Sequence, residues 1–294
     1  MNILVTGASG FIGSAIASKL KSEHEVIAAS RSGTAADGTR GLKWDITEEI
    51  PAELDGTEID VIVHAAASLS MDDMSPEAVM TNCVGTYNVF NLAVSKKVKR
   101  IVYISSLPVI GKPNGVITAD TPPAPLSIYH ASKAAGEMIV KQAERYGIGY
   151  VTLRVPSPVG VGMPEKTILS VMIKRALANE PLVIYGKGTR RQNYIDVRDI
   201  ACAVSGAAVA EHIENGIYNL ASDRTYSNNE VAELCRRVTG STSVIEHADK
   251  NDPYDDWDYT ADTKKLENAI GPYLLHDLED TVRHTAGSFA GSAG

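Results

Sequence analysis

The chain has 294 residues, of which 44% are hydrophobic and 22% charged, and this composition excludes an intrinsically disordered protein. Its formal net charge of −8 argues against a nucleic-acid-binding protein, which would present a basic surface. Its three cysteines lack close spacing, so we expect free thiols in a reducing compartment, with neither disulfides nor a metal site.

Short β-branched runs alternate with amphipathic stretches through the first half of the chain. Strands are predicted over residues 2–6, 25–29, 60–64, 100–104 and 149–154. Helices are predicted between them over residues 11–22, 75–97 and 128–146. Alternation of this kind is typical of βαβ units, so we expect an α/β protein with a doubly wound parallel sheet.

The second half of the chain has a different pattern. Segments rich in Gly, Pro and Arg enclose a predicted helix over residues 165–179, and further helices are predicted over 196–212, 225–240 and 276–286. We predict a dinucleotide-binding domain formed by residues 1–155 plus 191–213. A smaller, discontinuous substrate domain towards the C-terminus is predicted over 156–190 plus 214–286. Residues 287–294 are predicted to form a flexible tail.

Neither a leader peptide nor a membrane span is expected. The chain opens directly on the first predicted strand, without a basic segment and a cleavage site. No apolar run reaches the roughly 18 residues of a membrane span. We therefore expect a cytoplasmic protein with no membrane partner.

A glycine-rich turn, Gly7-Ala8-Ser9-Gly10-Phe11-Ile12-Gly13, follows the first predicted strand and opens the first helix. Glycines there allow a positive φ and let backbone N–H groups approach a pyrophosphate, to which the helix N-terminus adds partial positive charge. Three glycines can cluster by chance in an ordinary turn, but this first strand–helix junction is where a dinucleotide fold needs them. We predict a Rossmann-type fold whose turn contacts a cofactor through Gly7, Ser9, Gly10, Phe11, Ile12 and Gly13.

The end of the second strand indicates which dinucleotide binds. It carries Ser30, Arg31 and Ser32 in place of a carboxylate, and an arginine pairs well with a ribose 2′-phosphate. A solvated loop arginine is the alternative, and NADP is favoured over NAD. Asp45, which precedes Ile46, either accepts a hydrogen bond from the adenine amino group or caps a helix.

Tyr129 and Lys133 are four residues apart in a predicted helix, so their side chains share one face. A nearby ammonium lowers the pKa of a phenol from about 10, which allows acid/base chemistry with an alcohol or a ketone. Such pairs are common on solvated helices, but here Ser105 and Ser106 end an apolar strand at the sheet edge where ligands bind. A serine there can orient a substrate oxygen, and Ser105 is predicted to cap the next element.

Together these residues resemble the extended short-chain dehydrogenases/reductases, and within them the nucleotide-sugar epimerase/dehydratase group. The likeness extends from Thr6-Gly7 to about Gly271-Pro272. Beyond the motifs above, it includes the segments His64–Ala67, Asn82–Thr86, Val109–Gly111, Leu153-Arg154, Gly160, Pro181–Gly188, Asn193–Ala201 and Tyr218–Ala221.

The resemblance implies NAD(P)-dependent hydride chemistry in which Tyr129 is the general acid/base, Lys133 binds the nicotinamide ribose, and Ser106 is the catalytic hydroxyl. It also implies a homodimer formed through helices 75–97 and 128–146. The cofactor contacts that it adds are Ala65, Ala66, Ala67, Asn82 and Pro156. The substrate contacts that it implies are Ser106, Leu107, Ser157, Arg190, Arg191 and Gln192.

Departures from the family pattern narrow the function. Leu107-Pro108 replaces the Asp-Glu pair that the 4,6-dehydratases use for elimination. Gln192 stands where relatives place an arginine for a diphosphate, and the acidic stretch 250–258 stands where a second such arginine is expected. Its aspartates would repel a diphosphate if they faced the pocket, although an exposed acidic loop is the commoner meaning of such a run.

Two enzyme functions therefore remain. The leading hypothesis is a nucleotide-sugar 4-epimerase or a closely related sugar oxidoreductase. The alternative is an NADPH-dependent reductase or dehydrogenase of a non-nucleotide carbonyl or alcohol, which Arg31 and the weak diphosphate signature favour. A non-catalytic cofactor sensor is disfavoured because Ser106, Tyr129 and Lys133 are all present.

Overall fold

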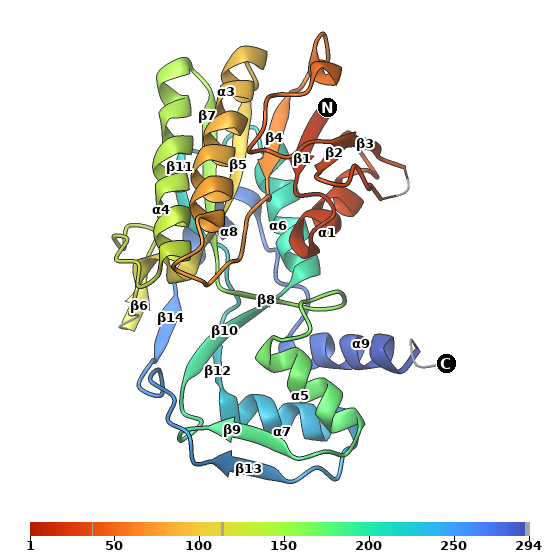
Figure 1. The fold of residues 1–294 in the computed structure, drawn as a ribbon, viewed down its shortest axis with the longest axis vertical. Coiled ribbons are helices and arrows are strands. Elements are labelled where there is room, and N and C mark those ends of the chain that lie inside the picture. The colour runs from red at the N-terminus through yellow and green to blue at the C-terminus, as the bar shows by residue number, and fades with distance from the viewer. Residues whose placement is uncertain (37, 113–114, 292–294) are drawn as a thin grey trace.

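A parallel sheet of seven strands forms the centre of the larger lobe (Figure 1). The computed structural model describes residues 1–36, 38–112 and 115–291. The strand order is β11-β7-β5-β4-β1-β2-β3, so the winding direction reverses between β1 and β4. The predicted doubly wound sheet is confirmed, with strands β1 (Asn2–Thr6), β2 (Glu25–Ser30), β3 (Arg40–Lys43), β4 (Val61–His64), β5 (Arg100–Ser106), β7 (Gly149–Val155) and β11 (Gly216–Asn219).

Helices cover both faces of this sheet because successive side chains of each strand point to opposite sides. In β1, Ile3 and Val5 pack in one core with α1 and α6, whereas Leu4 packs in a second core with α3 and α4. The near-continuous apolar runs of the sequence reflect this burial on both faces. The helices of the larger lobe are α1 (Phe11–Leu20), α3 (Thr86–Lys96), α4 (Ile128–Lys141), α6 (Val197–Val209) and α8 (Lys264–Ile270), with a 3₁₀ turn at Ala52–Leu54.

The second lobe has its own apolar core, which includes Leu169, Ile173, Val231 and Val282. In Figure 1 it lies below the main sheet, beyond the carboxyl ends of the strands. Strands β8, β10 and β12 form one small sheet, and β9 pairs with β13 in another. Its elements are β8 (Ser157–Val159), α5 (Ile168–Leu177), β9 (Leu182–Tyr185), β10 (Arg191–Asp196), β12 (Thr225–Ser227), α7 (Asn228–Thr239), β13 (Ile245–Ala248) and α9 (Leu278–Gly291). A further parallel pair joins β6 (Gly115–Ile117) to β14 (Tyr259–Ala261).

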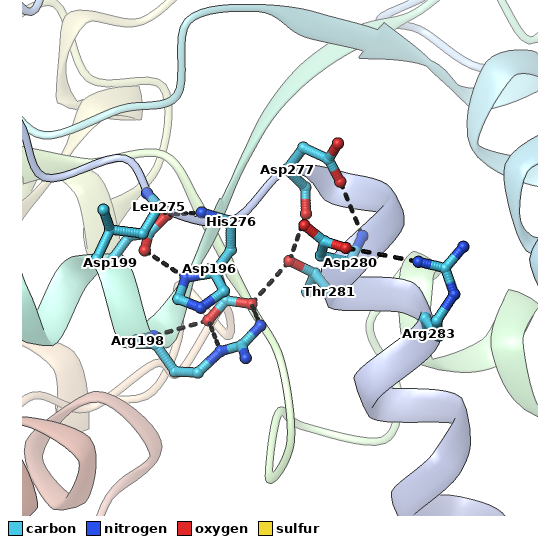
Figure 2. Close-up of polar contacts among 9 residues, drawn as sticks. All are labelled: Asp196, Arg198, Asp199, Leu275, His276, Asp277, Asp280, Thr281 and Arg283. Atoms are coloured by element: carbon cyan, nitrogen blue, oxygen red, sulfur yellow. Dashed lines mark hydrogen bonds and ion pairs between the residues drawn. The ribbon is translucent and has the colours of Figure 1, made fainter.

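Buried carboxylates at the start of α6 connect the two lobes (Figure 2). Asp196 caps α6 by accepting from the Arg198 backbone N–H at 2.8 Å, and its Oδ2 also accepts from the Thr281 hydroxyl of α9 at 2.7 Å. Asp199 accepts from the His276 backbone N–H at 3.1 Å and lies 2.6 Å from the His276 ring nitrogen Nδ1. The chain leading into α9 is therefore held against the first turn of α6.

The helix predicted over residues 75–97 is interrupted. It consists of α2 (Glu77–Val79), a π-helical segment η2 (Met80–Gly85) and α3. Within the wider turn, the Thr86 hydroxyl donates to the Asn82 carbonyl oxygen at 2.7 Å. Such π-helical segments occur mostly at functional sites. The helix predicted over residues 128–146 also changes character, because it ends in a 3₁₀ turn at Gln142–Tyr146.

The positions of β11, α8 and α9 differ from those that the predicted domain boundaries give. Strand β11 hydrogen-bonds to β7 at the edge of the main sheet, and Leu266 of α8 belongs to the core beside α6, although both fall within 214–286. Helix α9 runs to Gly291, past the predicted start of a flexible tail at residue 287. The aromatic ring of Phe289 explains this extension because it packs against the core of the second lobe.

We predict that Gly13→Ala destabilises the protein. A Cβ atom at Gly13 would lie 2.1 Å from the Gly7 carbonyl oxygen, so the backbone would have to shift, at a cost of about 1–3 kcal/mol. Gly287→Ala is the matched control, because this exposed helical site has no atom within 4 Å and alanine should stabilise it by roughly 0.5–1 kcal/mol. Urea unfolding of both variants tests the prediction, and equal midpoints would contradict it.

Candidate active site

The glycine-rich turn packs tightly against the loop that follows β4. Gly7 has a φ of +69°, and a Cβ atom there would lie 2.6 Å from the backbone of Ala66. The Gly10 N–H donates to the Gly7 carbonyl oxygen at 2.9 Å, and α1 begins at the next residue. The N-terminus of α1 is thereby fixed at the point where the sheet reverses its winding, which is where open α/β folds bind dinucleotides.

A cleft of about 350 Å³ lies beside this turn, at the carboxyl ends of β1, β2 and β4. Most of the residues predicted to hold the cofactor line it, namely Gly7, Ser9, Gly10, Ser30, Arg31, Asp45, Ile46, Ala65, Ala66 and Ala67. The cleft is also lined by residues that the sequence analysis missed, namely Trp44, Thr47, Ser68, Glu77, Met80 and Thr81. Trp44 and Thr47 could have been found as neighbours of Asp45, whereas the others belong to no recognisable motif.

The remaining residues of the glycine motif support the cleft from behind. Phe11 packs against the apolar core of the second lobe, and Ile12 packs against the core beside α1 and α6. Gly13 lies directly against Gly7. These three residues were predicted to contact the cofactor, but none of them is among the residues that line the cleft.

The rim of the cleft combines an exposed arginine with hydroxyls that hold the loop. The Ser30 hydroxyl donates to the Thr34 carbonyl oxygen at 3.1 Å, and Ser32 accepts from the Thr34 N–H at 3.2 Å. Arg31 is exposed at the rim. The two serines that were predicted to assist a 2′-phosphate therefore shape the loop that presents Arg31.

Asp45 caps a turn. Its Oδ1 accepts from the Thr47 N–H at 3.0 Å and from the Thr47 hydroxyl at 2.8 Å, and these two bonds lower the pKa of Asp45. The helix-cap alternative is wrong because the residues that follow form a turn. Since Asp45 also lines the cleft, the interpretation as an adenine acceptor stays a prediction.

Asn82, predicted to contact the cofactor, is buried within the protein. Its Oδ1 accepts from the Ser68 N–H at 2.9 Å, and its Nδ2 donates to the Ser68 carbonyl oxygen at 3.0 Å and the Ser132 hydroxyl at 2.9 Å. The amide thus has partners for both donor hydrogens and for its oxygen. In this arrangement Asn82 positions the loop that lines the cleft.

The catalytic candidates meet where β5 ends against α4. Ser106 is the last residue of β5, and Tyr129 and Lys133 lie in the first two turns of α4. The Ser106 hydroxyl is near enough to the Tyr129 phenol to lower the pKa of that phenol. Lys133 is only 3% exposed, and its Nζ lies 4.3 Å from the centre of the Tyr103 ring.

Burial shifts the pKa values of both Tyr129 and Lys133. Burial raises the pKa of Tyr129 to about 12, against the effect of the Ser106 hydroxyl. Burial lowers the pKa of Lys133 to about 7, against the charges of Glu137 and Cys83. The Lys133 amine lies over the Tyr103 ring and is not among the groups that shift the pKa of Tyr129 here, so the lowering of that pKa by Lys133 stays a prediction. With its pKa at about 12, the phenol is protonated and can donate.

A buried histidine lies behind the site. His64 ends β4, and its Nδ1 and Nε2 lie 2.7 Å and 2.9 Å from the hydroxyls of Thr6 and Thr86. Burial lowers the pKa of His64 to about 3, and the charge of Lys133 acts in the same direction. The ring is thus neutral and joins β1, β4 and α3.

Ser105 was predicted to cap the next element, and this prediction is wrong. Its hydroxyl donates to the buried carboxylate of Glu137 at 2.6 Å. Glu137 also forms an ion pair with Arg154 of β7, with 2.9 Å between Nη2 and Oε2. The sequence analysis missed Glu137, although its position four residues after Lys133 could have identified it as a neighbour.

On the substrate side, Leu107 is buried in a 3₁₀ turn (Leu107–Ile110) and packs in a small apolar cluster with Ile117 and Ala134. Pro156 and Ser157 follow β7 and are both half-buried. Ser157 pairs with Tyr194 of β10. These residues lie at the junction of the two lobes, but Pro156 does not line the dinucleotide cleft to which it was assigned.

The three predicted substrate residues before the Asn193-Tyr194 segment have different environments. Arg191 is engaged with the second lobe through Thr225, whose hydroxyl and carbonyl oxygen it contacts at 3.0 Å and 2.7 Å, and through Glu230 at 3.0 Å. Gln192 donates to the Tyr194 hydroxyl at 3.0 Å. Arg191 and Gln192 thus have structural partners, which weakens the prediction that they hold a substrate.

Arg190 is held differently. Its guanidinium lies 4.7 Å and 5.7 Å from the ring centres of Tyr254 and Trp257, and its buried Nε has no hydrogen-bond partner among the residues that the structure describes. The aspartates of the adjoining acidic segment, which were expected to repel a diphosphate if they faced the pocket, have partners in neighbouring loops. Asp255 accepts from the Lys187 N–H at 2.7 Å and Asp256 pairs with Lys112. These contacts agree with the alternative interpretation of the segment as an acidic loop at the surface.

Comparisons with known proteins place these features in context. Residues 3–221 match the model of the NAD dependent epimerase/dehydratase family. The chain is 28% identical over 318 residues to the UDP-glucose 4-epimerase of Halalkalibacterium halodurans, a match covering 97% of the chain and 94% of the relative. It is 28% identical over 333 residues to the dTDP-glucose 4,6-dehydratase of Neisseria gonorrhoeae, again covering 97% and 94%.

A solved structure of MoeE5 in complex with UDP-glucose and NAD is similar to the present one. The TM-score is 0.88 at 25% sequence identity, and the match covers 100% of both chains. Relatives with two different reactions match equally well, so the reaction of this chain has to be argued from its own residues.

We predict that His64 makes folding sensitive to acid. Its pKa of about 3 in the folded protein is below the ordinary value of about 6.5, so the unfolded chain binds a proton first as the pH falls. This stability is complete above pH 6.5 and is lost below it, by about 1.4 kcal/mol for each pH unit. Urea unfolding at pH 7.5 and 5.5 measures the loss, which should be smaller in His64→Gln. An equal loss in both proteins contradicts the prediction.

Proposed function

This chain belongs to the NAD dependent epimerase/dehydratase family, and we propose that it is a nucleotide-sugar 4-epimerase or a closely related sugar oxidoreductase. The observation that carries the proposal is the pairing of Tyr129, in the first turn of α4, with Ser106, at the end of β5, whose hydroxyl lowers the pKa of the phenol; the buried apolar side chain of Leu107 follows Ser106. The pair suits proton exchange with a sugar hydroxyl. Neither Leu107 nor Pro108 can move a second proton.

The side chains of Leu107 and Pro108 cannot transfer a proton, and this distinguishes epimerisation from dehydration. Elimination of water needs an acid and a base at the carbons next to the ketone, whereas epimerisation returns the hydrogen to the carbon that lost it. Leu107 packs against Ile117 and Ala134, so it presents only hydrocarbon beside the catalytic serine. These residues support the epimerase over the dehydratase, although both activities occur among the relatives.

The residues have distinct tasks in this proposal. The cleft beside Gly7 would hold a nicotinamide dinucleotide, which when bound takes a hydride from the carbinol carbon and returns it. Tyr129 has to be ionised to take the hydroxyl proton as that carbon is oxidised, and the phenol so formed returns the proton as the carbon is reduced. Ser106 orients the same oxygen, and Lys133 contributes positive charge one helical turn away.

A second candidate function is the net reduction of a non-nucleotide carbonyl. Arg191 and Gln192 are engaged with the second lobe, so the usual support for a diphosphate is weak at this position. Arg190, whose Nε has no partner in the described part of the chain, remains as the cation for an anionic substrate group. The partner molecule is in either case a small molecule.

We also propose that the cofactor is NADP in preference to NAD. Arg31 is exposed at the rim of the cleft, and β2 ends without a carboxylate that would repel a 2′-phosphate. The solved MoeE5 complex contains NAD, so the preference for NADP rests on Arg31 and on the lack of a carboxylate at the end of β2.

The proposed enzyme is a homodimer. Helices α3 and α4 lie side by side on one face of the sheet (Figure 1) and expose large apolar side chains. Tyr87 of α3 is 53% exposed and Met138 of α4 is 61% exposed, with Val84 and Ile128 nearby in the chain. An apolar surface of this kind favours association with a second copy.

We predict interconversion of the 4-epimers of a nucleotide sugar, without net change in absorbance at 340 nm. A panel that includes UDP-glucose is the starting point. Tyr129→Phe should reduce turnover at least a hundredfold, because it removes the group that carries the proton. Tyr185→Phe is the control: this exposed tyrosine of β9 should leave turnover unchanged.

Two outcomes would contradict this proposal. Consumption of added NADPH with stoichiometric product would identify the reductase instead. A Tyr129→Phe variant that is folded and turns over at nearly the wild-type rate would refute the assignment of the acid/base residue.

We predict that Arg31→Ala weakens binding of NADP more than binding of NAD. Loss of a charge-assisted contact to a 2′-phosphate should raise the dissociation constant for NADP about tenfold or more. Calorimetric titration with both dinucleotides measures this. Arg40→Ala is the control, because Arg40 is exposed on β3 and does not line the cleft. Equal losses for the two dinucleotides would sink the preference.

A further inference from the structure

A buried ionic cluster lies directly behind the catalytic residues. Glu137 follows Lys133 by one helical turn on α4 and is only 5% exposed. Its Oε1 accepts from the Ser105 hydroxyl at 2.6 Å and from the Arg154 Nε at 3.0 Å, and its Oε2 accepts from the Arg154 Nη2 at 2.9 Å. The Arg154 Nη1 donates to the Thr121 carbonyl oxygen at 2.8 Å. The carboxylate is therefore held by both oxygens.

Stability alone does not account for this cluster. Both members of the ion pair are almost completely removed from water, with side-chain exposures of 4% for Glu137 and 1% for Arg154. Such a pair costs several kcal/mol in desolvation for each ion, and apolar residues of similar volume often give equal or greater stability. The cluster lies between the catalytic strand and the catalytic helix, which indicates a role in the site.

Lys133 needs a negative charge to remain an ammonium in its buried position. Tyr103 offers the face of a neutral ring, and burial holds Tyr129 in its protonated form. His64 is a neutral ring at physiological pH, and burial raises the pKa of the Cys83 thiol. None of these groups, which face Lys133 from β5, α4, β4 and η2, supplies a full negative charge at neutral pH.

Glu137 supplies that charge. Its carboxylate is the largest influence that opposes the effect of burial on the pKa of Lys133. The bidentate contact with Arg154 fixes the direction of the carboxylate in its buried position. Arg154 belongs to β7, whereas Lys133 and Glu137 lie one helical turn apart on α4.

We propose that Glu137 is a positioning residue that keeps Lys133 in its ammonium form and holds α4 against the end of β5, where Ser106 meets Tyr129. This inference rests on the proposed function, because the ammonium matters through its part in acid/base catalysis. Ser105 is the residue before Ser106, so its hydrogen bond to Glu137 fixes the strand end beside the catalytic hydroxyl.

The test follows the titration of Lys133 directly, by the ¹³Cε chemical shift in the full-length protein, with Lys133→Arg to assign the signal. In Glu137→Gln the pKa of Lys133 should fall by about one unit, since a nearby opposite charge accounts for shifts of that size. The high-pH limb of kcat/KM should move to lower pH by the same amount, because Lys133 loses its proton earlier. Glu137→Asp, which keeps the charge, should restore most of both values.

Ser105→Ala is the matched control, because it removes one hydrogen bond from Glu137 and leaves the carboxylate charge in place. Its Lys133 pKa should remain within a few tenths of the wild-type value. Where Glu137→Gln fails to fold with Arg154 left unpaired, the double variant Glu137→Leu/Arg154→Leu removes both charges from the core. It should fold and still show the lowered pKa of Lys133.

An unchanged Lys133 titration in a folded variant without the carboxylate overturns the proposal, whatever its activity. A lowered kcat in Glu137→Asp and Glu137→Gln alike, with the pH limb unmoved, also overturns it by identifying a purely structural role. Absence of epimerase activity in the wild type refutes the proposed function and leaves the titration result to be judged separately.

Discussion

The active site depends on how closely α4 can lie against β5. A Cβ atom at Gly136 would lie 2.1 Å from the Tyr103 hydroxyl oxygen, so any larger residue at this position would force the helix or the buried Tyr103 ring to shift. The close approach brings the Tyr103 hydroxyl to 3.4 Å from the Lys133 carbonyl oxygen and places its ring under the Lys133 amine. The meeting of Ser106 with Tyr129 follows from the same contact.

Much of the fold could be predicted because its determinants are local. The sheet strands of the first half are apolar on both sides, so each stands out as a short β-branched run, and parallel pairing follows from the helices between them. The glycine turn was predictable for the same reason, since Gly7 requires a positive φ that few other residues adopt. The pairing of Tyr129 and Lys133 needs only the periodicity of one helix.

The partners of polar side chains could not be predicted, because they come from distant parts of the chain. Asn82 is bonded to Ser68 and Ser132, and Arg191 to Thr225 and Glu230, so neither has the role that its position in a motif implies. The charge of Lys133 is a further example. Spacing alone gives its neighbours on the helix, whereas its protonation depends on burial among four separate elements.

Phe11 gives the two lobes a shared component. It is the first residue of α1, directly after the turn proposed to hold the pyrophosphate, yet its ring packs in the core of the second lobe. Opening of the molecule along that junction would expose more of this half-buried ring to water, at part of the roughly 1.5–3 kcal/mol that full exposure of a buried phenylalanine costs. The contact between the lobes is therefore supported by the residue that begins the helix after the glycine turn.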